Sequence, residues 1–535
     1  MSCLEAFDDD RARTYAWHMA QRRFDDFALL LHGSDNVGVL KRPVKPGDEL
    51  LYSHRCLPIT ESIGPGHKIA LVGIPVGEYV KKYGQIIGVA RSAIAPGQHV
   101  HTHNLALQDF ERDMAFCSEV HPVQVYPHEK MLHFQGYARA NGSVGTRNYL
   151  AVISSVNCSA SVSGYVRDRF RGEDFRREFP NVDGVVAFTH KGGCGLDPGE
   201  PRQILQRVLA GIAKHPNISG FVLIGLGCEV NQVDELRRAT LLDENLATAG
   251  TPTFLNIQAT GGVRKTVEAG VEATATLLRA ANDLRRTSQP ISKLILAENC
   301  GGSDGNSGIT ANPALGVAAD QLVRYGASVV LAETPEIYGA EHLLTRRAIT
   351  REVGEKLLER IRWWEAHVRL HRSTLDNNPS PGNKAGGLTT IYEKSLGAVA
   401  KAGQSPLTAV YEYAEAIRSP GLCFMDTPGY DPVSMTGLVA GGCNVAVFTT
   451  GRGSVYGCKP APCIKVATHT ALFRWMEEDM DLNAGTILDG TETLSQVGQR
   501  IFEKIISVAS GEKTKSELAG LGDEEFAPWQ LGPTF

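Results

Sequence analysis

Short apolar runs separated by turns mark the first hundred residues of the chain. Proline and glycine stand together in these turns, at Pro46-Gly47, Pro65-Gly66 and Pro96-Gly97, a pairing that favours tight reversals. The runs that they separate are candidate strands at residues 27–31, 36–40, 69–71, 78–81 and 86–90. The pattern predicts an all-β domain over residues 27–104, with an N-terminal extension (1–26) before it and a linker (105–135) after it.

From residue 149 onwards, apolar strands alternate with segments of helical period. The first series of candidate strands covers residues 150–156, 182–188, 220–224 and 253–257, and the second covers residues 293–297, 328–332, 421–425 and 445–448. Alternation of this kind is typical of parallel, doubly wound sheets. We therefore predict two α/β domains with mainly parallel, Rossmann-like sheets, a central one over residues 136–288 and a C-terminal one over residues 289–535.

Composition narrows the function classes. The chain has 535 residues, of which 42% are hydrophobic, so several domains with substantial cores are expected. A net charge of -5 argues against a nucleic-acid-binding face, and no apolar run is long enough to suggest a membrane span. Eleven cysteines without an export signal predict reduced thiols and a cytoplasmic location.

A polar loop follows the predicted strand at residues 293–297. It runs from Glu298 to Pro313 and is rich in Gly, Ser, Asn and Asp. Ligands bind at the carboxyl ends of strands in open α/β sheets, so this loop is the predicted centre of a site, with Ser303 and Asp304 as substrate-binding candidates. An ordinary strand-to-helix turn is the competing interpretation.

Three histidines alternate at the end of the β domain, at His99, His101 and His103. Side chains two residues apart on a strand share a face, so these imidazoles could hold a divalent metal or cover another domain's site. The alternative is a solvated face of an edge strand. His32 and His67 fall at other strand ends or turns of the same domain.

Four cysteines fall at the carboxyl ends of predicted parallel strands: Cys158, Cys194, Cys228 and Cys300. Converging thiolates would favour iron, zinc or an iron–sulfur cluster, whereas buried structural thiols are the alternative.

Three basic residues in polar loops could grip the carboxylate of an acidic substrate. Arg147 is followed by Asn148, a further substrate-binding candidate, and Lys384 and Arg452 lie in later turn-rich loops. Structural ion pairs and solvated side chains are the competing interpretations.

Together the segments 142–148, 190–194, 225–229, 300–313, 378–387 and 449–453 resemble the altronate/galactarate dehydratase family. The N-terminal β domain resembles the SAF (β-clip) module of those enzymes, and residues 99–104 and 335–341 are more similar to the altronate branch. The resemblance covers nearly the whole chain, from about Phe27 to Leu518.

This resemblance implies a hydro-lyase that converts D-altronate into 2-dehydro-3-deoxy-D-gluconate and water with Fe(II) or Mn(II). Galactarate dehydration and a sulfolactate-type lyase are the alternatives. Such chemistry needs a base for the C2 proton, for which we favour His190, with Lys191 and Glu333 as rivals. The expected partners are a sugar acid and further copies of the chain, in a homodimer or larger oligomer.

The sequence is compatible with two alternative sets of metal ligands. One is Cys158, Cys194 and Cys300, which could alternatively hold an iron–sulfur cluster; the other is His32, His67, His99 and His101.

Two other function classes fit the sequence less well. A dinucleotide-dependent oxidoreductase would need a Gly-x-Gly-x-x-Gly after an early strand, with an acidic residue beyond it, and the chain has none. A non-catalytic sugar-acid-binding module would not need so many polar loops at strand ends.

Overall fold

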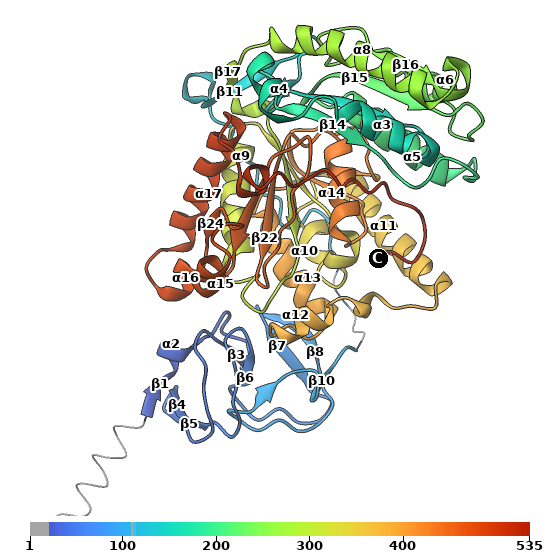
Figure 1. Cartoon of the computed structure of the whole chain (residues 1–535). Helices are drawn as coiled ribbons and strands as arrows, with labels where there is room; N and C mark the ends of the chain where they lie inside the picture. The colour runs from blue at the N-terminus through green and yellow to red at the C-terminus, as the bar shows by residue number, and fades with distance from the viewer. Residues whose placement is uncertain (1–20, 109–111, 113) are drawn as a thin grey trace, which may run out of the picture. The chain divides into compact units, whose positions relative to one another are not determined.

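The structure is a computed structural model that describes residues 21–108, 112 and 114–535 (Figure 1). The chain forms two compact units. Unit 1 comprises Met1–Glu111, Ser303–Asn306 and Asp376–Leu396, and unit 2 comprises Arg112–Gly302, Ser307–Leu375 and Gly397–Phe535. Residues 1–20 of the predicted extension, and 109–111 and 113 of the predicted linker, lie outside the described residues.

Unit 1 is built on three small sheets, as the turn pattern predicted. Their strands, in spatial order, are β1 (Gln21–Arg23), β4 (Glu49–Tyr52) and β5 (Arg55–Pro58); β2 (Ala28–Leu29), β3 (Val37–Leu40), β6 (Lys68–Ala70) and β9 (His99–Val100); and β10 (Leu105–Ala106), β8 (Gln85–Ala90) and β7 (Tyr79–Lys82). All pairs are antiparallel except β1 with β4.

Backbone conformation explains the turns of unit 1. Gly47, Gly66 and Gly97 have φ angles of 90°, 81° and 83°, which glycine adopts without steric cost after a proline. The domain begins earlier than its predicted start at Phe27, because β1 pairs with β4 and Phe24 of α2 (Phe24–Phe27) is buried in the core.

Two segments from the later part of the chain complete unit 1. They are residues 303–306 of the polar loop and residues 376–396, which contain α12 (Pro381–Ala385) and most of α13 (Ile391–Val399). Both segments lie within the predicted C-terminal α/β domain, whereas in the folded chain they belong to unit 1. Their inclusion in unit 1 is what positions the site described below.

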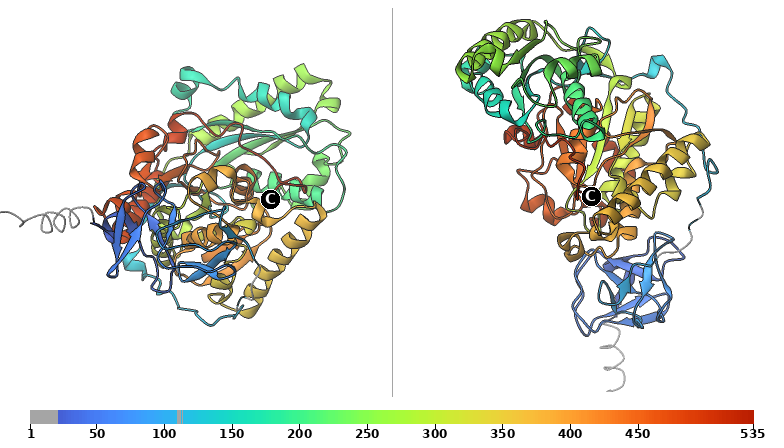
Figure 2. Two further views of the ribbon diagram at one scale, coloured as in Figure 1. Left: turned by 90° about the horizontal axis from the view of Figure 1, so that it is seen from below. Right: turned by 90° about the vertical axis from the view of Figure 1, so that its right-hand side faces the viewer.

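The first sheet of unit 2 is four-stranded and parallel, in the order β14 (Gly184–Phe188), β13 (Tyr149–Ser154), β15 (Ile218–Gly225) and β16 (Thr253–Asn256). Leu150 and Val152 face a cluster with α3 (Ala160–Arg167) and α8 (Val263–Asn282), whereas Ala151 and Ile153 face α5 (Glu200–Ala213). The helices thus cover both faces, and α8 runs along the outer one (Figure 2). The shorter helices of this region are α4 (Gly172–Glu178), α6 (Val233–Thr240) and α7 (Ile257–Thr260).

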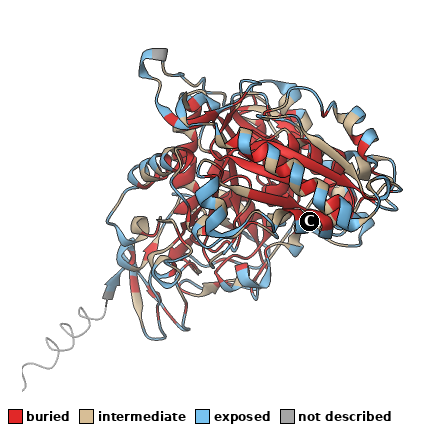
Figure 3. Ribbon diagram, turned by 45° about the horizontal axis from the view of Figure 1, so that its top comes forward, coloured by how far each residue is buried: buried red, intermediate tan, exposed pale blue. Residues whose placement is uncertain are grey.

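The second sheet of unit 2 is seven-stranded and also parallel. Its order is β20 (Leu407–Tyr411), β21 (Gly421–Met425), β19 (Ser328–Leu331), β18 (Ile295–Cys300), β22 (Val445–Thr450), β23 (Cys463–Ala467) and β24 (Leu482–Asn483). Helix α14 (Asp431–Ala440) packs on one face, and α9 (Ala311–Arg324) and α17 (Leu494–Ala509) pack together on the other (Figure 1). Both sheets are almost fully buried between helices whose outer sides are exposed (Figure 3).

The remaining helices of unit 2 are α10 (His342–Thr345), α11 (Arg351–Leu370), α15 (Thr470–Trp475), α16 (Thr486–Asp489) and α18 (Lys515–Leu518). A small antiparallel sheet joins β11 (His133–Ala138) to β12 (Val144–Gly145) and to β17 (Thr287–Pro290). The domain boundary predicted between residues 288 and 289 therefore falls inside strand β17. In the described part of the chain, no helix combines the length and hydropathy needed to span a bilayer.

Candidate functional site

A cluster of histidines occupies the end of β9 in unit 1, as the alternating sequence predicted. We call His67, His99, His101 and His103 the histidine cluster. Ring centroids lie 5.0 Å apart for His67 and His99, 5.1 Å for His99 and His101, and 5.3 Å for His67 and His101. His103 lies 5.6 Å from His99.

Backbone carbonyls of α12 fix two of these rings. The Nε2 atom of His101 lies 2.9 Å from the carbonyl oxygen of Lys384, and that of His67 lies 3.3 Å from the carbonyl oxygen of Ala385. A carbonyl only accepts, so both Nε2 atoms carry the proton, and each Nδ1 keeps a lone pair. His67 Nδ1 lies 2.9 Å from Nε2 of His99, which must therefore be the donor of that pair.

Burial favours the neutral form of His67, His99 and His101. It lowers the pKa of His67 and His101, and together with the neighbouring imidazoles it lowers the pKa of His99 to about 3. Neutral imidazoles with one N–H directed at a carbonyl are the form in which histidines bind metals. His32 does not join the cluster, because its exposed ring is bonded to Ser34 in another loop.

Two polar loops pack against the cluster through their backbones. Asn383 Nδ2 donates to the carbonyl oxygen of Ser303 (2.8 Å), and the N–H of Gly305 donates to the carbonyl oxygen of Gly386 (2.8 Å). A Cβ atom on Gly305 would lie only 1.9 Å from the carbonyl oxygen of Gly66, so glycine is required there. The loops at 303–306 and 380–387, both singled out in the sequence, are thus brought together with His67 and His101.

The predicted substrate-binding residues of these loops lie in the same place. Asp304 accepts hydrogen bonds from the backbone and side-chain N–H groups of Asn306. The hydroxyl of Ser303 is buried and has no hydrogen-bond partner among the described residues, and the side chain of Lys384 is partly exposed. Unit 1 therefore gathers Ser303, Asp304 and Lys384 beside the histidine cluster.

A charged group that the sequence analysis missed lies beneath this site. Glu393 of α13 accepts hydrogen bonds from Lys68 of β6 (2.8 and 2.9 Å) and Lys82 of β7 (2.9 Å), and all three side chains are buried. Burial opposes the charged form of Glu393, but the two ammonium groups outweigh it and lower the pKa of the carboxyl. The only sign of this group in the sequence is a charged residue within a largely apolar strand or helix, such as Glu393 in α13.

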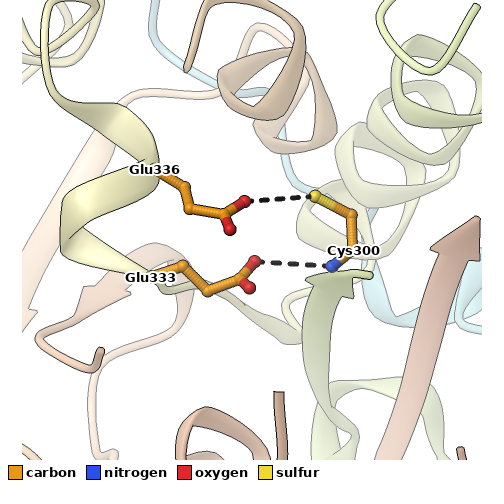
Figure 4. A group of neighbouring side chains, drawn as sticks. All are labelled: Cys300, Glu333 and Glu336. Atoms are coloured by element: carbon orange, nitrogen blue, oxygen red, sulfur yellow. Dashed lines mark hydrogen bonds between the residues drawn. The ribbon is translucent and has the colours of Figure 1, made fainter. Parts of the chain in front are cut away.

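A second buried cluster lies in unit 2, at the carboxyl end of β18 and in the segment that follows β19. Cys300 Sγ and one carboxylate oxygen each of Glu333 and Glu336 lie within 4.8 Å of one another (Figure 4). Among the described residues this is the tightest set of potential ligands, tighter than the histidine cluster.

This second cluster already contains a cation. Lys401 Nζ lies 2.9 Å from Cys300 Sγ and 3.1 Å from Glu333 Oε2. Burial opposes the charge on Lys401, but Cys300, Glu333 and Glu336 outweigh it and raise the pKa of the ammonium. Because a metal ion would be repelled by this ammonium, we favour the histidine cluster as a metal site. Glu333, with a φ of 69° and a carboxylate paired with Lys401, is buried rather than poised as a base.

The structure does not bring the three predicted cysteines together. Cys158 and Cys194 are exposed beyond β13 and β14 of the four-stranded sheet, whereas Cys300 is buried at the end of β18 in the seven-stranded one. Strand ends converge only within one sheet, and Cys300 belongs to the second sheet, that of the predicted C-terminal domain. Cys228, also exposed, follows β15 of the first sheet.

Arg147 and Asn148 have structural roles, contrary to the prediction that they bind substrate. All five N–H groups of Arg147 are used, by Glu517 (2.6 and 2.8 Å) and by backbone carbonyls. Asn148 is likewise buried and donates to the carbonyl oxygens of Asn181 and Ala281. Arg452 is exposed in unit 2, and its N–H donates to the carbonyl oxygen of Gly302.

His190 is also held by the backbone, contrary to the prediction of a general base. The Gly192 N–H donates to Nδ1 (3.2 Å), so Nε2 carries the proton and donates to the carbonyl oxygen of Ser154 (3.0 Å). Burial lowers the pKa of His190 to about 4. Lys191 is exposed on the same loop.

Family models match three consecutive parts of the chain. The model described as the altronate/galactarate dehydratase SAF domain matches residues 26–108. The second domain of D-galactarate dehydratase/altronate hydrolase matches residues 136–282, and the C-terminal domain of D-galactarate/altronate dehydratase matches residues 291–534.

Curated relatives are similar over nearly the same length. Altronate dehydratase of Bacillus subtilis is 35% identical over 489 residues, which cover 91% of this chain and 96% of the relative. Galactarate dehydratase (L-threo-forming) of Escherichia coli is 38% identical over 508 residues, covering 93% and 96%. The beta subunit of (2R)-sulfolactate sulfo-lyase of Chromohalobacter salexigens is 30% identical over 403 residues, covering 74% and 97%.

The low pKa of His190 predicts a pH-dependent stability. His190 has a pKa of about 6.5 in the unfolded chain and about 4 in the folded protein. Between these two values the unfolded chain binds a proton that the folded protein does not bind, so the free energy of unfolding decreases as the pH falls through this window. Between pH 7 and pH 5 the loss attributable to His190 should be about 2 kcal/mol. Urea titrations at both pH values should show a smaller loss for His190→Gln than for the natural chain. The exposed His133→Gln should leave the loss unchanged; equal losses for all three proteins would contradict the role of His190.

Removing the cation of the second cluster should destabilise unit 2. Lys401→Met leaves buried carboxylates without their counter-ion, and we expect a cost of about 3–5 kcal/mol in the free energy of unfolding. The matched control is Lys356→Met, which breaks a pair with Glu415 whose side chains are both 41% exposed; it should cost less than about 1 kcal/mol. Similar costs for the two variants would show that Lys401 is not the counter-ion of this cluster.

Proposed function

Because the chain belongs to the altronate/galactarate dehydratase family, we propose that it is a hydro-lyase that converts D-altronate into 2-dehydro-3-deoxy-D-gluconate and water. The observation that carries this proposal is similarity to two altronate dehydratases, each 35% identical over 91% of the chain. It extends from the SAF domain to the C-terminus, so the segments of the histidine site are included.

The reaction removes the C2 proton and the C3 hydroxyl of the substrate. A proton next to a carboxylate is weakly acidic, so the negative charge that develops must be stabilised by cationic or hydrogen-bonding groups. We propose that Lys384 binds the substrate carboxylate, and that Ser303 and Asp304 orient its hydroxyl groups. Their convergence beside His67 and His101 in unit 1 supports this assignment.

We propose that His67, His99 and His101 hold the Fe(II) or Mn(II) ion expected for the family. The residues fit, because three neutral imidazoles lie together and the carbonyls of Ala385 and Lys384 orient two of them. When bound, such an ion supplies Lewis-acid stabilisation of negative charge on substrate oxygens. An iron–sulfur cluster on Cys158, Cys194 and Cys300 is not proposed, because these thiols end strands of two different sheets.

Galactarate is the second candidate substrate, because the galactarate dehydratase of Escherichia coli is 38% identical to this chain. It differs from altronate in carrying a carboxylate at both ends.

The cytoplasmic location and the homodimer or larger oligomer stay predictions. The ten cysteines of the described residues, all free thiols, support the location.

Side-by-side assays should separate the candidate substrates. Purified protein, loaded anaerobically with Fe(II) or Mn(II), is incubated with altronate, galactarate and sulfolactate, and 2-oxo acid formation is measured. We expect dehydration of altronate with kcat/KM at least about tenfold above that for galactarate, a difference of about 1.4 kcal/mol in transition-state binding. A preference for galactarate would make galactarate, and not altronate, the substrate. Inactivity on every sugar acid would refute the proposed function.

Removing one histidine of the cluster should abolish metal binding. We expect His99→Ala to lose bound metal, measured by elemental analysis after anaerobic gel filtration, and to lose activity by about 10²-fold or more. The control is His32→Ala, which removes a histidine of unit 1 outside the cluster and should keep both. Full metal content in His99→Ala would place the ion elsewhere.

A further inference from the structure

One backbone conformation beside the site is unusual for its residue type. Tyr83 and Gly84 form the turn between β7 and β8, with φ angles of 62° and 70°. Both central residues of such a turn need a positive φ, which suits Asn-Gly and is strained for a bulky aromatic residue. Strain of this kind persists only where the surrounding structure imposes it, and it gathers at functional sites.

Asp35 imposes the conformation. Its buried carboxylate accepts hydrogen bonds from the N–H groups of Tyr83 (3.0 Å), Gly84 (2.7 Å) and His32 (3.0 Å). A tyrosine is therefore held by a dedicated anchor where an asparagine would fit without strain. The anchor acts on the backbone, so it fixes where the phenol points without touching the ring.

The phenol lies over the buried charges. Lys82 Nζ is 4.8 Å from the ring centre of Tyr83, bonded to Glu393, and 3.5 Å from the carbonyl oxygen of Gly305 in the polar loop. Lys68, Lys82 and Glu393 are almost wholly inaccessible to solvent, whereas Tyr83 keeps part of its surface open. Tyr83 is thus the accessible member of a group with two ammoniums and one carboxylate.

The charges around Tyr83 act on its hydroxyl in both directions. Burial raises the pKa of Tyr83, and Lys82 works in the opposite direction by stabilising the phenolate. Glu393 and Asp304 oppose the phenolate, which leaves the residue protonated at neutral pH as an acid must be. An adjacent ammonium is the group that stabilises the anion formed after proton transfer.

We propose that Tyr83 is the general acid of the dehydration, donating its hydroxyl proton to the departing C3 hydroxyl of the sugar acid. This inference rests on the proposed function. In the step, a base of the site accepts the C2 proton, the C2–H electron pair becomes the C2=C3 bond, the C3–O bond breaks, and the phenol proton joins the leaving hydroxyl to form water; the base then returns its proton to solvent. The phenolate is stabilised by Lys82 and recovers a proton from solvent, and the enol product tautomerises to the 2-oxo acid.

The test compares Tyr83→Phe with the natural chain on two substrates, D-altronate and its 3-deoxy-3-fluoro analogue. Fluoride leaves without needing a proton, so a missing acid matters only for the hydroxyl substrate. We expect kcat for altronate to fall by about 10²- to 10⁴-fold with KM changed less than about threefold. With the fluoro analogue, measured by fluoride release, the two proteins should agree within about fivefold.

Further variants keep the outcomes separable. Tyr83→Asn, whose side chain suits a positive φ, should show the same leaving-group dependence as Tyr83→Phe. The control Tyr52→Phe, at a half-buried tyrosine that packs against the core of unit 1, should behave as the natural chain. Equal losses on both substrates, or no loss in Tyr83→Phe, would overturn the inference while the proposed function stands. A natural chain that dehydrates no sugar acid would instead refute the proposed function, and the role of Tyr83 with it.

Discussion

A single buried carboxylate, Glu393, connects the parts of unit 1 that are distant in sequence. It is bonded to lysines on two different strands, Lys68 and Lys82, and to the hydroxyl of Thr389 (2.6 Å) at the start of its own helix. A buried charge is tolerated only when it is paired and hydrogen-bonded, so these partners are not interchangeable with water. Residues 376–396 are thereby bound to a β domain that precedes them by some three hundred positions.

Close backbone contact reinforces this connection. The carbonyl oxygen of Gly66 lies where Cβ atoms on Gly305 or Gly387 would be, at 1.9 and 2.3 Å, so no larger residue fits at either position. Glycine therefore serves two purposes in this chain: it forms turns in the β domain, and it lets three loops meet at the histidine cluster. The second purpose accounts for Gly305 of the polar loop.

The buried charges of the two units contrast with each other. In unit 1, two ammoniums share one carboxylate, and the excess positive charge lies below an accessible phenol and a group of imidazoles. In unit 2, Lys401 is surrounded by Cys300, Glu333 and Glu336, and no solvent reaches them. The first arrangement can act on an anionic ligand; the second stabilises a junction of strands and a turn.

The sequence by itself determined the fold class, because hydrophobic periodicity and turn residues are local properties. The strand at residues 421–425 has the predicted bounds, and the parallel order of both large sheets follows from strand–helix alternation. His99, His101 and His103 were predicted to share one face of a strand. Their rings do lie close together, but β9 ends at Val100, and His101 and His103 belong to the turn that follows it.

Only the tertiary structure decided which residues meet. Cys158 follows one apolar strand and Cys300 ends another, and these strands belong to different sheets, so a shared position at strand ends does not bring the two thiols together. Arg147 and His190 have side chains suited to a site, but Arg147 donates its hydrogen bonds to Glu517 and His190 donates to the backbone carbonyl of Ser154. Lys68, Lys82 and Glu393 were missed for the converse reason: a charge becomes significant when burial removes water from it, and burial is a property of the whole fold.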